Sequence, residues 1–152
     1  IRSNEIFSIN LVSLCLMIFD IRPLNSEDYD TILVDWWKDW GWTPPPKDFL
    51  PDNGKGGMMI LDGEIPVCAG FIYMTNSNVY LLEFMVSNKK YRKKPHRKNA
   101  MGLLIETLTN ISKNQGAKYC YSLLKHKSLM GTFESLGYVK GDSNTFEMIK
   151  NL

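Results

Sequence analysis

The residues from 79 to 108 restrict the possible fold more than any other part of the chain. An apolar run over 79–86 is followed by a basic stretch over 87–98 and then by an amphipathic segment. The run predicts a buried strand, and apolar residues at helical spacing predict a helix over 98–113. Seven of the 18 lysines and arginines lie among the ten positions from Lys89 to Lys98. Because backbone N–H groups and the positive end of the helix dipole meet there, this junction predicts an anion site.

The rest of the chain alternates between strand-type and helix-type patterns. Further helices are expected over 26–40 and 128–136, each ended by a glycine. Further strands are expected over 18–23, 58–61, 65–74 and 117–124, with a closing hairpin formed by 138–140 and 145–149. This order predicts an α/β fold with a mixed, mostly antiparallel central sheet flanked by helices on both faces.

Length and cysteine usage set the domain organisation and compartment. A chain of 152 residues is sufficient for one domain with its own core. Met17 begins a segment typical of a natural start, so we expect residues 17–152 to form the domain and residues 1–16 to be an N-terminal extension that need not be native. The apolar run within 9–19 is too short to span a bilayer, and no membrane association is expected.

Three cysteines without a CxxC pair favour reduced thiols and a cytoplasmic protein. The apolar extension could supply a contact for a homodimer.

The overall charge argues against some partners. The net charge is only +2, so a nucleic-acid partner is not expected, and Tyr91 is the one aromatic residue within the basic stretch that could stack on a base. His96 and His126 have no cysteine or histidine at ligand spacing, so no metal site is expected. Two interpretations of the basic stretch stay open: a phosphate site, and a solvated run of charge.

Two segments resemble the GNAT superfamily of N-acetyltransferases. The segment VSNKKYRKKPHRKNAMGLLI is similar to the end of that family's fourth strand and the helix after it, and HKSLMGTFESLGYVKGD is similar to a second family segment. The resemblance covers residues 18–152. It implies that acetyl-coenzyme A binds between the fourth and fifth strands and that its acetyl group passes directly to a primary amine of unknown identity. The pattern with WWKDWGWTPPP also looks like the small GNAT-like proteins of tailed phages.

The resemblance assigns roles by position. Backbone groups facing the pantetheine arm of the coenzyme would come from Phe84, Met85 and Val86. The pyrophosphate would be held by Arg92, Lys93, Lys94, Arg97, Lys98 and Asn99. His126 takes the place of a family asparagine at the coenzyme. The family's two loop glycines fall on Pro95 and Arg97, and its tyrosine falls on Phe133. These departures support an alternative, a catalytically impaired GNAT-fold binding or virion-associated module.

Glu83 is the catalytic candidate. It interrupts the apolar strand LLEFMV, and burial of a carboxylate raises its pKa toward the range of a general base. Several GNAT proteins resemble this chain in having a basic glutamate on this strand, which implies that Glu83 deprotonates the incoming ammonium. The alternative is that Glu83 faces solvent or pairs with a lysine.

Four tryptophans gather between positions 36 and 42. The spacing of Trp36 and Trp40 predicts that both pack in the core. Trp37 and Trp42 are candidates for lining an acceptor pocket or a partner surface.

Overall fold

A five-stranded sheet forms the centre of the computed structural model, which describes Cys15, residues 18–93 and residues 95–152. The strands lie in chain order: β1 (Asp20–Pro23), β2 (Gly57–Asp62), β3 (Ile65–Tyr73), β4 (Val79–Ser87) and β5 (Tyr119–Tyr121). The first four pair antiparallel, and β5 runs parallel to β4. The prediction of a mixed, mostly antiparallel sheet is confirmed.

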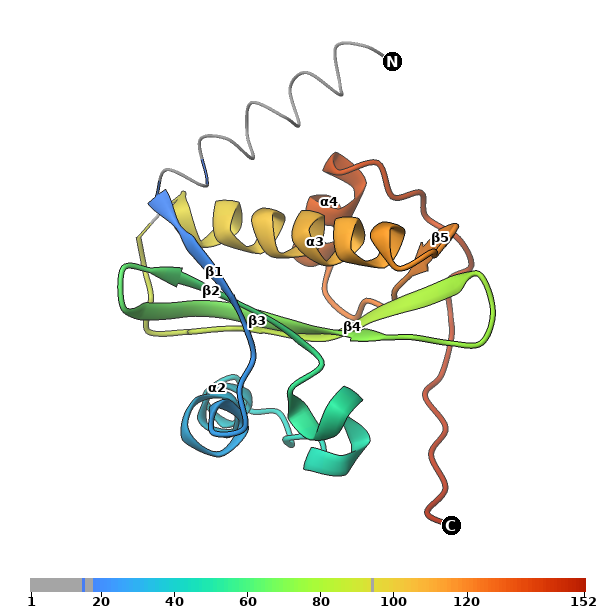
Figure 1. Ribbon diagram of the computed structural model, residues 1–152, viewed down its shortest axis with the longest axis horizontal. Coiled ribbons are helices and arrows are strands. Elements are labelled where there is room, and N and C mark those ends of the chain that lie inside the picture. Colours follow the sequence, from blue (N-terminus) through green and yellow to red (C-terminus); the bar gives the residue numbers. More distant parts are fainter. Residues whose placement is uncertain (1–14, 16–17, 94) are drawn as a thin grey trace.

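Helices cover both faces of the sheet (Figure 1). On one face lie α3 (His96–Asn114) and α4 (Lys127–Ser135). On the other lie a π-helical turn η1 (Tyr29–Leu33) that leads directly into α2 (Val34–Asp39), and two 3₁₀ turns, η2 (Lys47–Phe49) and η3 (Pro51–Gly54). We refer to these as the α3 face and the α2 face. The helices expected over 98–113 and 128–136 are confirmed, and the one expected over 26–40 is present in a shorter form.

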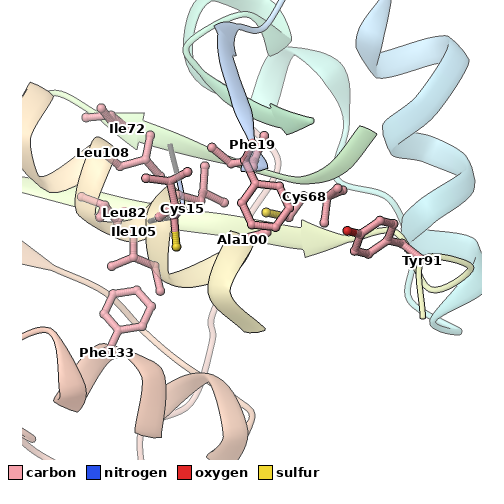
Figure 2. Close-up of a cluster of buried hydrophobic side chains, with 14 residues drawn as sticks. Cys15, Phe19, Cys68, Ile72, Leu82, Tyr91, Ala100, Ile105, Leu108 and Phe133 are labelled. Carbon is pink, nitrogen blue, oxygen red and sulfur yellow. The ribbon is translucent and has the colours of Figure 1, made fainter. Parts of the chain in front are cut away.

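The core of the α3 face is built from the apolar stripe of α3. Its buried side chains are Ala100, Leu103, Leu104, Ile105 and Leu108, and they pack on Ile60, Val67, Cys68, Ile72 and Leu82 of the sheet. Figure 2 shows Phe133 of α4 directed at Ile105 from outside the stripe. Phe133 is only 2% exposed, so this side chain closes the core between the two helices.

The core of the α2 face has its own apolar cluster. Leu33, Trp36, Trp37 and Leu50 pack there against Met59, Ala69, Phe71 and Val86. Trp36 is in the core as predicted, and Trp40 is partly buried. The suggestion that Trp37 lines a pocket or partner surface is wrong, since it is 3% exposed. Consecutive helical residues point about 100° apart, and the apolar stripe is wide enough to take both rings.

An ion pair with a buried carboxylate joins β1 to the start of the helical segment on the α2 face. Asp28 accepts hydrogen bonds from the two terminal nitrogens of Arg22 at 2.7 and 2.9 Å, and from the backbone N–H of Asn25 at 2.8 Å. Burial acts to raise the pKa of Asp28, but the Arg22 and Asn25 hydrogen bonds outweigh it and hold that pKa below its ordinary value. The turn between β1 and η1 is therefore fixed by one carboxylate.

The C-terminal part differs from the sequence-based expectation. The strand expected over 117–124 is present, but only as the three residues of β5, and the expectation that it is buried is wrong, because Tyr119 and Tyr121 are 64% and 50% exposed. The closing hairpin expected over 138–140 and 145–149 is also wrong, since no strand is formed after β5 in the described chain. The Tyr138 ring packs on Phe133 at 4.8 Å, and its hydroxyl lies 2.6 Å from that of Thr109. These contacts hold the chain at Tyr138 against α3 and α4, so this segment does not pair with the edge of β5.

Little can be said of the N-terminal extension, because residues 1–14, 16 and 17 lie outside the described part. Cys15 is buried against the α3-face core, and its thiol donates to the Asn99 carbonyl at 3.8 Å. Among the described helices, none is both long and apolar enough to cross a bilayer.

Candidate functional site

A β-bulge in the middle of β4 is the first element of the candidate site. Val86 pairs with Ala69, but the next pair joins Glu83 to Phe71, so β4 has one residue more than β3 over this interval. Phe84 has a positive φ of 55°, which is unusual for a bulky side chain. Both Phe84 and Phe71, the partner of Glu83, belong to the α2-face cluster. The bulge therefore directs two consecutive side chains, Glu83 and Phe84, to the same face.

Glu83 is half-buried at this bulge. Its Oε1 accepts the backbone N–H of Leu123 at 2.8 Å. Burial raises the pKa of Glu83 to about 7, against the lowering effect of the Leu123 N–H; Glu147 raises it further and Lys125 lowers it. In the described part of the chain, Oε2 has no donor of its own. A carboxylate that titrates near neutrality and keeps one oxygen open can accept a proton from a bound ammonium group.

Backbone pairing between β4 and β5 stops next to Glu83. The parallel register runs from Val79 with Tyr119 to Leu81 with Tyr121. Beyond it, the Ser122 hydroxyl donates to the Leu82 carbonyl at 2.6 Å, and the Glu83 carboxylate takes the Leu123 N–H. Side chains thus replace backbone hydrogen bonds where the two strands part. The strand ends consequently present polar groups that a ligand can use.

The basic segment after β4 is held in place by Tyr91. This ring is only 5% exposed, and its hydroxyl donates at 2.7 Å to Oδ2 of Asp62, the last residue of β2. The hydrogen bond from Tyr91 contributes most to lowering the pKa of Asp62. Burial and the Asp62 carboxylate raise the pKa of Tyr91 to about 12. Tyr91 is a structural anchor and is not available for stacking on a nucleic-acid base.

The first turn of α3 offers fewer amides than a glycine-rich loop. Pro95 is the N-cap residue and has no N–H. The Arg97 N–H donates to the Lys93 carbonyl at 3.2 Å, and the Asn99 N–H donates to the Pro95 carbonyl at 3.2 Å. Since two amides are already used and Pro95 has none, binding of an anion here relies more on side chains than it would at a glycine-rich loop.

The side-chain cations divide into engaged and open groups. Lys93 lies 3.4 Å from Asp62, and the Arg97 guanidinium donates to the Tyr91 carbonyl at 3.4 Å. Arg92 and Lys98 are exposed, and neither makes an ion pair within the described residues. Lys94 falls outside the described part. An open hollow of about 530 Å³ lies beside these cations and is lined by Ile65, Asn88, Lys90, Tyr91, Arg92 and Lys93.

A row of stacked rings crosses from the basic segment to α4. Trp40 stacks on Trp42 with centroids 5.7 Å apart, and Trp42 stacks on His126 at 5.1 Å. Trp40 also donates its indole N–H to the Ser87 carbonyl at 2.8 Å. The guanidinium of Arg97 lies 5.2 Å from the Trp40 ring. His126, at the N-cap of α4, thereby lies in one continuous row with the residues at the end of β4.

The site residues predicted from sequence occupy two neighbouring regions. The strand region holds Glu83 and the bulge at Phe84, followed by Met85 in the α3-face cluster and the buried Val86 in the α2-face cluster. The loop region holds Arg92, Lys93, Arg97, Lys98 and Asn99. Phe133, the position of the family tyrosine, lies in the core and has no polar function. Three metal-ligating side chains do not come together anywhere in the described residues.

Three polar groups that help to build the candidate site were not identified from the sequence. Asp62 accepts from the anchor Tyr91, and Ser122 and the Leu123 amide bridge the two strand ends. Asp62 could have been noticed only as the first residue of a hairpin turn. The other two depend on the β4–β5 register, which the sequence does not encode locally.

Comparison with known proteins identifies the fold. No protein-family model and no curated protein sequence matches the chain significantly. A GNAT family acetyltransferase of Staphylococcus aureus superposes with a TM-score of 0.56 at 16% identity, over 88% of this chain and 100% of that one. Glucosamine-6-phosphate N-acetyltransferase of Arabidopsis thaliana gives 0.60 at 14% identity, over 87% and 99%. AAC(6')-Iy, in complex with the bisubstrate analogue CoA-S-monomethyl-acetylneamine, gives 0.58 at 15% identity, over 88% and 99%.

The chain therefore has the fold of the GNAT acetyltransferases, and the resemblance inferred from its two segments is confirmed at the level of the fold. The likeness extends over nearly the full length of each of these proteins. At these identities it defines the architecture alone.

Proposed function

We propose that this protein is an N-acetyltransferase that moves an acetyl group from acetyl-coenzyme A to a primary amine. The observation that carries the proposal is the position of Glu83, whose pKa is near 7 at a bulge where β4 and β5 stop pairing. A cationic segment follows the same strand. A proton acceptor and an anion site are thus held by one strand of an acetyltransferase fold.

The coenzyme would be held mainly by side chains. Its pyrophosphate would interact with Arg92 and Lys98, the open cations, and with Lys93 and Arg97 after they leave their present partners. Charge-assisted hydrogen bonds from lysine and arginine can replace amide donors at phosphate groups. Trp42 and His126 would form one wall beside the strand ends.

The reaction follows from the state of the Glu83 carboxylate. The carboxylate accepts a proton from the bound ammonium and leaves a neutral amine. The amine nitrogen forms a bond to the acetyl carbon while the carbon–sulfur bond breaks. The nitrogen then loses its second proton to water, which gives the neutral amide, and the sulfur leaves as a thiolate that takes up a proton from water. Glu83 then returns its proton to solvent, so that protons and charge balance over one turnover.

Removing an open cation should weaken coenzyme binding. We expect Arg92→Ala to raise the dissociation constant for acetyl-coenzyme A by about five- to tenfold, the effect of one charge-assisted contact at an exposed site. Isothermal titration calorimetry measures this change. Lys113→Ala is the matched control, because it removes one charge at the C-terminal end of α3, the end that lies away from the basic segment.

The titrations also test the proposal as a whole. If the wild-type protein gives no heat at millimolar acetyl-coenzyme A, the proposed function is wrong. Binding without turnover against a panel of primary amines would instead indicate a GNAT-fold binding module. Equal weakening by Arg92→Ala and Lys113→Ala would show that only net charge matters and would remove the proposed phosphate site.

A further inference from the structure

Three aromatic rings lie beside Glu83 on the α2 face. Phe84 follows Glu83 at the bulge, Phe49 is the last residue of η2, and Tyr73 is the last residue of β3. The Phe49 ring meets the Phe84 ring edge-to-face with centroids 5.6 Å apart, and the Tyr73 ring lies 6.2 Å from the Phe84 ring. We call these three residues the aromatic wall. Phe49 is 43% exposed, so the wall is open to solvent on its side.

Tyr73 fixes the wall in place relative to the carboxylate. Its hydroxyl donates to the Phe49 carbonyl at 2.8 Å, which ties η2 to the end of β3. Its backbone pairs with Leu81, two residues before Glu83 in β4. Burial, and to a smaller extent the charge of Glu83, raise the pKa of Tyr73 to about 12. The wall and the Glu83 carboxylate therefore belong to one surface, which the strand pairing holds together.

The charges around Glu83 leave one open carboxylate. Burial is the main cause of its raised pKa, and the charges of Glu147 and Lys125 act on that pKa in opposite directions. These two side chains pair with each other at 3.1 Å. A ligand with a single ammonium group can pair with Glu83, whereas a second cation would find the other carboxylate of this group already paired.

The wall offers few hydrogen-bonding groups. The side chains of Phe49 and Phe84 have none, and the hydroxyl proton of Tyr73 is used by the Phe49 carbonyl. A sugar or a polyamine would place hydroxyl or amino groups against these rings, where they would lose water without gaining a partner. A largely apolar surface with one charged group instead suits a ligand of the same composition, which the charged group orients.

We propose that the acceptor is an arylalkylamine, a primary amine joined to an aromatic ring by a short alkyl linker. This assignment rests on the proposed function and names the substrate class of the same site. The acceptor ring would pack on Phe49 and Phe84 in the offset or edge-to-face geometry that aromatic pairs prefer. Its ammonium group would reach the open oxygen of Glu83. Because consecutive Cα atoms are about 3.8 Å apart, a linker of about two carbons spans the distance from Phe84 to Glu83.

The transfer balances for such an acceptor. The ammonium nitrogen loses two protons and gains the bond to the acetyl carbon, while the carbon–sulfur bond breaks and the thiolate takes up one proton. The products are the N-acetyl arylalkylamine, coenzyme A and one released proton. Because the amide carries no charge, the product no longer pairs with Glu83 and can leave the wall.

Acceptor preference tests the substrate class. At saturating acetyl-coenzyme A, kcat/KM for phenethylamine should exceed that for cyclohexylethylamine, which has the same carbon skeleton without the aromatic ring, by about two- to tenfold. It should exceed that for putrescine, a diamine, by about tenfold or more. Phe49→Ala should lower the phenethylamine value by about five- to tenfold, mainly through KM, and reduce its advantage over cyclohexylethylamine.

The matched control is Ile18→Ala. Ile18 is 42% exposed, similar to Phe49, and it precedes β1, which two strands separate from β4. This variant should leave the values for all three amines unchanged. Far-UV circular dichroism of Phe49→Ala should match wild type, since the side chain is exposed. If that variant does not fold, Phe49→Leu, which keeps an apolar side chain without the ring, supplies the same comparison.

Binding separates this assignment from the proposed function. Titration of para-fluorophenethylamine in the presence of coenzyme A, followed by fluorine NMR, gives a dissociation constant without turnover, and Phe49→Ala should raise it about five- to tenfold. Binding that depends on Phe49 without any acetylated product would refute acetyl transfer and keep the arylalkylamine site. Turnover without a preference for phenethylamine over cyclohexylethylamine, or with a preference for putrescine, would overturn the substrate class and leave acetyl transfer standing. Absence of binding would also overturn the assignment.

Discussion

Replacing Glu83 by glutamine should lower kcat/KM for acetyl transfer by about 10²- to 10⁴-fold, the usual loss when a positioned general base is removed. Glutamine keeps the shape of the side chain and can still accept the Leu123 N–H through its carbonyl oxygen. The dissociation constant for acetyl-coenzyme A should change by less than about twofold, since the base acts on the amine. Steady-state kinetics and calorimetry on the same preparations separate the two quantities.

The pH dependence of the rate supplies a second readout. Because Glu83 must be ionised to accept a proton and its pKa is about 7, kcat/KM should rise with pH through that value in the wild-type enzyme. The step near 7 should be absent in Glu83→Gln. The control is Glu106→Gln on α3, another half-buried carboxylate whose pKa is raised by burial, which should keep the step. A Glu83→Gln rate within about threefold of wild type would exclude Glu83 as the base.

The same group links stability to pH. The pKa of Glu83 is about 7 in the folded chain, and an unfolded glutamate titrates at about 4.3. Between these values the folded state binds the proton more tightly, so the contribution of Glu83 to the free energy of unfolding falls as pH rises from about 4.3 to 7. Thermal unfolding at several pH values should show a smaller decline for Glu83→Gln than for wild type.

Replacing Asp28 by alanine should have the largest effect on stability among single polar changes, a loss of about 3 kcal/mol in the free energy of unfolding. The substitution removes the acceptor of three hydrogen bonds and leaves the Arg22 guanidinium without its partner. Urea denaturation measures the change. Because the pKa of Asp28 is lowered by folding, its stabilising contribution is present above about pH 3.9 and is lost as pH falls through the lower folded value.

The control for Asp28 is an exposed ion pair on the same helical segment. Asp30 lies 3.3 Å from Lys47 and its side chain is 68% exposed, so Asp30→Ala should cost less than about 1 kcal/mol. Similar losses for the two variants would mean that burial of the Arg22–Asp28 pair adds nothing.

Local sequence patterns correctly predicted elements that bury one face and expose the other. The stripe of α3 was foreseen because Leu104, Ile105 and Leu108 recur at helical spacing and meet one sheet face. The strand β4 was foreseen for a different reason, because its apolar run fits a strand that is covered on both faces. The C-terminal hairpin was not, because alternation shows only that a segment can form a strand, and whether it does depends on an edge being within reach of its own chain.

For the candidate site, the sequence indicated the types of residue but not the contacts among them. The cations of the basic segment were identified, but the burial of Tyr91 against Asp62 joins residues that lie 29 positions apart. The stacking of Trp42 on His126 likewise depends on the packing of α2 and α4 against opposite faces of the sheet. Contacts of this kind follow from the tertiary arrangement, and no periodic pattern in the sequence indicates them.

The extra residue at Phe84 sets the phase of the whole distal half of β4. Side chains of a strand repeat with a period of two, so a β4 with the same residues but no bulge would exchange the faces of every side chain on one side of Phe84. If the end that pairs with Ala69 kept its place in such a strand, Glu83 would turn from the α2 face into the apolar layer beneath α3, and Leu82 would turn away from it. The bulge thus keeps the carboxylate out of the core and Leu82 within it, which makes position 84 the point at which the fold and the chemistry are jointly encoded.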